Sequence, residues 1–183
     1  MLGLPQFSMI FRGLAVSAIE RSARGIVACI LKDDTEGGKD VNVYKKVDEV
    51  DFTQWSEANH DYFKLIFAGA PSTVIAIRLS ANAEDYNAAL SRLKNLKWNY
   101  LTIPEIKPAD VSTVAAWIKQ YRNDENKTFK AVLAHCAGDH EGIINLTTEN
   151  ISSTITEKKH SAAQYCARIC LLYTSDAADE EDS

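Results

Sequence analysis

The residues best suited to chemistry lie in one short stretch of the chain. They are His135, Cys136, Asp139, His140 and Glu141. A cysteine beside a histidine can supply a nucleophile and its base, and histidine, aspartate and glutamate are common metal ligands. The stretch therefore raises one catalytic hypothesis, a small α/β hydrolase or a metal-dependent enzyme that uses His135, Cys136, Asp139 and His140.

The spacing of these residues favours a structural role instead. Adjacent residues on a strand point to opposite faces, so His135 is badly placed to activate Cys136. His135 and His140 lie on either side of a glycine turn, whereas the histidines of a helical metal motif share one face. We therefore expect a buried Cys136 at a strand end. We expect Asp139–Glu141 to form a polar turn that caps the structure or contacts a neighbouring subunit, and we assign no catalytic residue, cofactor or metal.

Alternating strand and helix patterns surround this turn. Apolar residues run or alternate in the predicted strands and recur at helical spacing in the predicted helices. The strands are predicted at 26–31, 41–47, 72–79, 100–103, 128–134 and 142–147, and the helices at 51–69, 82–97, 108–122 and 161–169. Because strand and helix alternate from residue 72 onward, successive strands should be parallel, with right-handed crossovers. The predicted fold class is α/β, a layered sandwich with a largely parallel or mixed sheet flanked by helices. A small N-terminal β unit or hairpin is expected to precede it.

The charge, the cysteine spacing and the apolar runs of the sequence argue against nucleic-acid binding, zinc binding and membrane spans. Five of the 25 acidic residues fall in the last fourteen positions, which leaves 20 acidic and 20 basic residues in the rest of the chain. A neutral body does not predict binding to nucleic acid. The four cysteines fit no zinc spacing, and no apolar run approaches the roughly 20 residues of a membrane span. The start of the chain has no basic segment and no small-residue cleavage site, so we expect an intracellular, soluble protein without a signal peptide.

The C-terminal tail has an unusual sequence. Residues 170–180, CLLYTSDAADE, resemble the translation of a transposase adapter used to prepare sequencing libraries. The alternative is a genuine acidic, disordered terminus, which this composition also suits. We expect residues 170–183 to be a non-native, disordered tail and leave them out of the fold prediction.

Several segments resemble, in order, contractile phage tail sheath proteins of the type found in phages and phage-like particles of Gram-positive bacteria. The resemblance runs from about Gly3 to Ile169, and the segment pair Asp139–Asn145 and Tyr165–Ile169 is its most specific part. The other matching segments are Gly3–Pro5 with Ala18–Ala28, Trp98–Leu101 with Pro104–Glu105, and Ala116–Ile118.

The resemblance implies a structural rather than an enzymatic function. Such subunits stack in hexameric rings around a tail tube, and the sheath they form contracts when the baseplate triggers it. The implied partners are other copies of the chain, the tail tube protein and the baseplate, without nucleic acid or membrane. The implied location is the virion tail, after assembly in the cytoplasm of the bacterial host. The core is expected to be subtilisin-like and non-catalytic.

The resemblance also predicts how the chain is organised into segments. We expect an N-terminal β-rich segment at 1–50, an incomplete α/β sheath core at 51–169 and the tail at 170–183. The family's leader strand and its distal half with the C-terminal arm have no counterpart in the sequence. We therefore expect this chain, a truncated fragment, to lack both interlocking arms and to be unable to build a contractile sheath by itself.

Six residues are candidates for contacts between subunits: Arg21, Arg24, Asp139, His140, Glu141 and Trp55. Core packing is the favoured interpretation of Trp55, and an exposed tryptophan at this position could instead anchor an interface. The charges at Arg21, Arg24, Lys32, Asp33 and Asp34 predict either a solvated face or ion pairs that exchange between subunits.

Overall fold

The fold is built around one six-stranded sheet. The computed structural model describes residues 25–170. The strand order is β2-β3-β1-β4-β5-β6, with β2 antiparallel to β3 and the other neighbours parallel. The strands are β1 (Ile26–Lys32), β2 (Val41–Tyr44), β3 (Thr73–Leu79), β4 (Tyr100–Thr102), β5 (Lys130–Ala134) and β6 (Ile143–Leu146). The predicted α/β class with a largely parallel sheet is confirmed.

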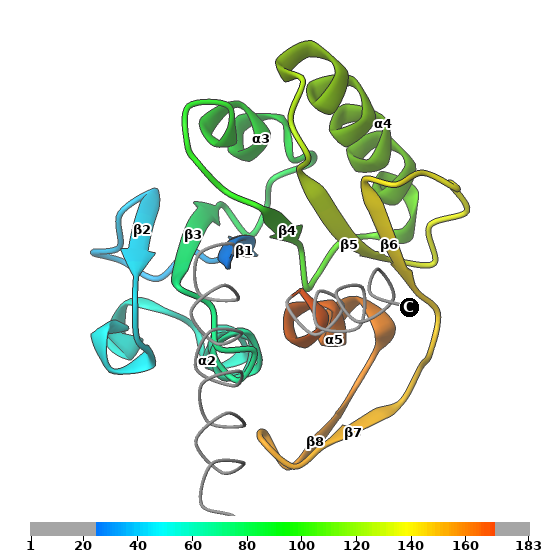
Figure 1. Ribbon diagram of the computed structural model, residues 1–183. Helices are drawn as coiled ribbons and strands as arrows, with labels where there is room; N and C mark the ends of the chain where they lie inside the picture. The colour runs from blue at the N-terminus through cyan, green and yellow to red at the C-terminus, as the bar shows by residue number, and fades with distance from the viewer. Residues whose placement is uncertain (1–24, 171–183) are drawn as a thin grey trace, which may run out of the picture.

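Helices cover both faces of this sheet. Figure 1 shows α3 and α4 on one face and α2 and α5 on the other. The helices are α2 (Glu57–Phe67), α3 (Asn87–Leu93), α4 (Pro108–Glu125) and α5 (Ala162–Ile169), and two 3-10 turns, η1 (Val47–Glu49) and η2 (Phe52–Gln54), precede α2. Among residues 25–170, no helix is long and apolar enough to cross a membrane.

The central strands are apolar on both sides because each side is covered. In β1, Ala28 and Ile30 pack beneath α3 and α4, whereas Val27, Cys29 and Leu31 pack against α2 and α5. A parallel sheet buried on both faces needs such continuous apolar runs. The run at 26–31 thus places β1 in the centre of the sheet.

The structure differs from the predicted hairpin of residues 26–31 and 41–47. β3 lies between β1 and β2, and β2 pairs with β3 alone. β3 pairs with one side of β1 after the crossover through α2, and β4 occupies the other side of β1. The chain after β1 must therefore reach the outer side of β3 to find a partner.

A second, two-stranded sheet was missed by the sequence prediction. β7 (Ile151–Ser153) and β8 (Lys158–His160) form an antiparallel hairpin beside α5 (Figure 1). Lys158 Nζ lies 2.5 Å from Asp61 Oδ2, which ties the hairpin to α2. The two strands have three residues each and are mostly polar, so they carry little of the alternation that predicts a strand.

Candidate functional site

His135 and Cys136 directly follow β5 and differ in exposure. The His135 side chain is exposed, and its Nε2 lies 2.6 Å from Glu149 Oε1. Cys136 is buried, and its backbone N–H donates to Asn145 Oδ1 at 2.8 Å. Glu149 also accepts from the backbone N–H of Ala162 at 3.1 Å, the first residue of α5. The hydrogen bond from His135 lowers the pKa of Glu149. The histidine therefore joins β5 to α5, and the structure does not bring it to the thiol.

The polar turn at residues 139–142 is held by α4. The buried Arg122 of α4 pairs with the carboxylate of Glu141 and donates to Phe129 O at 2.5 Å. The hydrogen bond from Arg122 lowers the pKa of Glu141. A Cβ atom on Gly142 would lie 2.5 Å from Arg122 Cδ, so only glycine lets the chain pass this close to the arginine.

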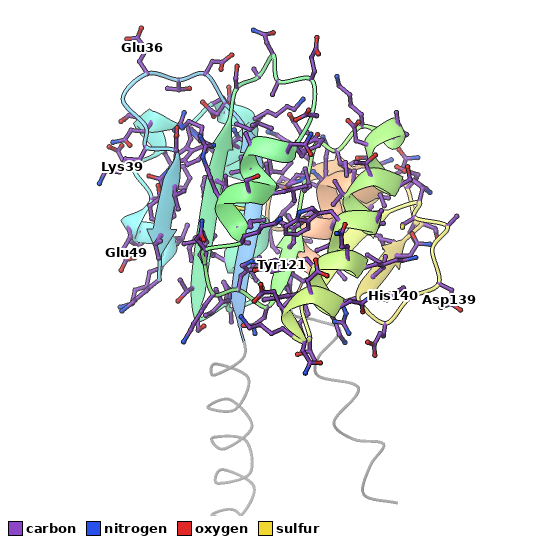
Figure 2. The ribbon with its side chains drawn as sticks, turned by 90° about the horizontal axis from the view of Figure 1, so that it is seen from above. Glu36, Lys39, Glu49, Tyr121, Asp139 and His140 are labelled. Atoms are coloured by element: carbon purple, nitrogen blue, oxygen red, sulfur yellow. The ribbon has the colours of Figure 1, made fainter. Side chains whose placement is uncertain are left out.

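Within the turn, His140 organises the backbone. Its Nδ1 accepts from Gly142 N–H at 3.0 Å, and its carbonyl accepts from Ile143 N–H at 2.8 Å. Figure 2 shows Asp139 and His140 at the outer end of the molecule beside β6. Asp139 is exposed and His140 half-buried. The turn thus presents these two side chains outward from a fixed backbone, while Glu141 already has a partner within the chain.

No metal centre forms in the part of the chain that the structure describes. None of its groups of three or more histidine, cysteine, aspartate or glutamate residues could hold an ion. The side chains of residues 135–141 can connect β5 to α5 through His135 and Glu149, and they can present the charge of Asp139 at the surface.

Trp55 lies in the core, which confirms core packing and is inconsistent with an exposed interface anchor at this position. The residue is 3% exposed, and its Nε1–H donates to Tyr44 Oη at 3.2 Å. Its ring meets Phe63 edge-on at 5.1 Å between centroids. The Arg78 guanidinium lies 4.2 Å from the ring centroid on its face. Trp55 thus packs between Tyr44 of β2 and Phe63 of α2.

Asp33 is buried as well, which corrects the prediction of a solvated face at this position. It lies 3.0 Å from Arg78 Nη1 and accepts from Ser56 N–H at 2.7 Å and from Asn59 Nδ2 at 2.6 Å. Burial alone would raise the pKa of Asp33, but hydrogen bonds from Ser56, Thr35 and Asn59 hold it well below its usual range. This polar cluster joins the ends of β1 and β3 to the start of α2. The candidate contacts Arg21 and Arg24 lie outside the described residues.

Comparison with known proteins gives a consistent result. No protein-family model matches the chain. The tail sheath protein of Clostridium phage phiCD119 is 36% identical over 185 residues, which covers 96% of this chain and 49% of the relative. An uncharacterized Bacillus subtilis protein, YqbK, is 32% identical over 87 residues, 44% of this chain and 19% of that protein. The chain thus spans about half the length of its phage relative.

Two solved structures share the fold. The sheath tail protein of Desulfitobacterium hafniense aligns with a TM-score of 0.65 at 16% identity, over 81% of this chain and 58% of that one. The sheath tail protein of Listeria innocua aligns with a TM-score of 0.65 at 14% identity, over 89% and 60%. At these identities the structures establish the fold, and the phage relative supplies the sequence evidence. This chain is therefore a homologue of phage tail sheath proteins and spans about half the length of its phage relative.

Proposed function

We propose that this chain is a structural subunit of a contractile phage tail sheath. In this proposal copies stack in rings around the tail tube, and the sheath contracts to drive the tube into the host envelope. The observation that carries the proposal is the 36% identity to a phage tail sheath protein over 96% of the chain. The shared fold of two sheath tail proteins supports it.

The proposed partners are other copies of the chain, the tail tube protein and the baseplate. The proposed location is the virion tail, after assembly in the host cytoplasm. Asp139 and His140 are the candidate subunit contacts best supported by the geometry, because a turn braced by Arg122 presents both outward (Figure 2). Glu141 can take part only while it shares its carboxylate with Arg122.

The enzymatic alternative gains no support from the site. An activated thiol needs a base within hydrogen-bonding distance, whereas the His135 ring pairs with Glu149 and Cys136 is buried. Nothing in the arrangement of Asp139 and His140 favours a second function.

Co-sedimentation with tail tubes tests the proposal. The purified 183-residue chain would be mixed with tail tubes stripped of their sheath from the related Clostridium phage, and the pelleted fraction measured against chain concentration. We expect saturable pelleting with the tubes and little pelleting without them. A chain that stays in the supernatant at every concentration, alone and with tubes, would contradict the proposal.

A further inference from the structure

The six-stranded sheet has two open edges at opposite ends of the molecule. β2 forms one edge and β6 the other, and each pairs on one side only with a strand of residues 25–170. Figure 2 shows Lys39 beside β2 at one end, and Asp139 and His140 beside β6 at the other. An open strand edge presents backbone N–H and C=O groups to which another strand can bind.

The outward groups of β2 follow from its pairing. Asp40 O accepts from Arg78 N–H, so alternate residues from 40 onward face β3. The N–H and C=O groups of Val41 and Val43 therefore point away from the sheet. Neither residue bonds through these groups to a residue in the described range.

The outward groups of β6 follow in the same way. Gly142 O and Leu146 O accept from β5, so Ile143 and Asn145 face outward. The Ile143 N–H already donates to His140 O. Three backbone groups on this edge then have no backbone partner among residues 25–170: the C=O of Ile143 and the N–H and C=O of Asn145.

We propose that copies of this chain associate head to tail, with the β6 edge of one copy paired antiparallel to the β2 edge of the next. β2 runs opposite to β6 within the sheet, so copies related by translation meet in the antiparallel sense. This inference rests on the proposed sheath function, because it names the surface through which copies would join.

One register satisfies the open groups on both edges. With Val41 opposite Asn145, these two residues can exchange both of their backbone hydrogen bonds. The same register sets Val43 opposite Ile143, where the Val43 N–H can donate to the free carbonyl. Three backbone hydrogen bonds would thus join the copies.

The side chains agree with this register. Val43 is 58% exposed, the more exposed of the two large apolar residues at the surface of residues 25–170. Val41 and Ile143 both pack at the margin of the core beneath α3 and α4, and Val43 lies on the same face of β2 as Val41. Opposite pairs in antiparallel strands share a face, so Ile143 of the next copy would cover the exposed Val43.

The charges at the two edges are complementary. Lys45 and Lys46 follow β2, and Asp139 and Glu141 precede β6. In the proposed register Lys45 lies opposite Glu141 and diagonal to Asp139. Asp139 has no ion pair with any described residue.

The acidic residues near β2 do not cancel these lysines. Asp40 pairs with Arg92 at 2.6 Å, and Glu49 accepts from the backbone N–H of Lys45 at 2.7 Å. The proposed contact joins two different surfaces, so it does not close on itself as a two-fold dimer does. Such a contact generates rings or open rows of subunits.

A charge swap between Lys45 and Asp139 tests the contact. Each of Lys45→Glu and Asp139→Lys would place like charges together across every contact, and we expect the apparent dissociation constant for self-association to rise about tenfold or more. The double variant and an equal mixture of the two single variants restore opposite charges, so light scattering should show association close to that of the unaltered chain.

A backbone test addresses the hydrogen bonds. Val43→Pro removes an outward N–H and no bond within the sheet, and proline is tolerated on edge strands. Val43→Thr is the matched control because it keeps the N–H. With both variants melting as the unaltered chain does, we expect Val43→Pro to be monomeric and Val43→Thr to associate.

The outcomes separate this inference from the proposed function. Self-association that neither the charge swap nor Val43→Pro alters would overturn edge pairing and leave the sheath function standing. Loss of association in the single charge variants without recovery in their mixture would also overturn it. A chain that is monomeric at all concentrations would count against both the inference and the proposed function.

Discussion

At the scale of single residues, the buried pair of Arg78 and Asp33 has the largest predicted effect on stability. The Arg78 side chain is 8% exposed and that of Asp33 is fully buried. Arg78→Met would leave the carboxylate buried without its cation, so we expect the free energy of unfolding to fall by about 3–5 kcal/mol. Urea denaturation followed by circular dichroism measures this change.

Arg92→Met is the matched control for that prediction. Arg92 pairs with Asp40 at the surface, where the side chains are 35% and 68% exposed. Exposed pairs contribute about 1 kcal/mol or less. Equal losses in the two variants would contradict the claim that burial makes the Asp33–Arg78 pair important.

The same aspartate predicts a dependence of stability on pH. Burial opposes ionisation of Asp33, but its hydrogen bonds outweigh burial, so its pKa is lower in the folded than in the unfolded state. The stabilisation is present at neutral pH and is lost as pH falls below about 4, where the unfolded chain takes up the proton first. Between pH 7 and pH 3, the unaltered chain should lose more stability than Asp33→Asn, as urea midpoints would show. Parallel losses in the two proteins would contradict this.

The thiols give a third prediction at this scale. All four cysteines are buried, and burial raises the pKa of Cys166 to about 12 and that of Cys29 well above its ordinary range. The thiolate is the reactive form, so the folded chain should react with Ellman's reagent at pH 8 only after unfolding. Rapid labelling of Cys136 in the folded chain, lost in Cys136→Ala, would revive the enzymatic alternative.

The residue predictions from sequence succeeded where local geometry decides and failed where tertiary contacts decide. Cys136 is buried next to an exposed His135, as strand alternation predicted, although both residues lie just beyond β5 and His135 has a positive φ of 51°. Local alternation does not predict the burial of Asp33, because it depends on Arg78, 45 positions away along the chain. Trp55 is buried because Tyr44 and Arg78 close over it, and neither contact leaves a periodic signal in the sequence.

At the scale of elements, α5 depends on a clear local signal at its start. Ser161 accepts from Gln164 N–H at 3.3 Å, and Gln164 Oε1 accepts from Ser161 N–H at 3.1 Å. Ser161→Ala removes this capping box and should lower the free energy of unfolding by about 1 kcal/mol. Thermal melts would measure the change, with Ser152→Ala on the exposed side of β7 as the control. An unchanged melting temperature in Ser161→Ala would contradict the assigned cap.

Elements with strong periodic patterns were predicted and weakly patterned ones were not. β3 and α4 lie close to their predicted positions because apolar residues recur at the strand and helix periods. The predicted helix at 82–97 is shortened to α3, because Asp85 turns the chain by accepting from Asn87 N–H at 2.9 Å. The β7–β8 hairpin is held partly by Lys158 and Asp61, a long-range pair that no local pattern indicates.

At the scale of the whole molecule, the sequence predicted the layers but not the strand order. Alternating strands and helices require a covered, mostly parallel sheet. The position of β2 outside β3 follows from competition for the two sides of β1, which only the assembled sheet reveals. This position also leaves β2 and β6 as the outer strands, and the proposed association depends on those two edges.

Sedimentation velocity of the purified 183-residue chain, across a wide range of concentrations, tests the central claim most directly. The proposed sheath function requires copies of the chain to join, so we predict species heavier than the 20.3 kDa monomer whose proportion grows with concentration. A single 20.3 kDa species at every concentration would contradict the account.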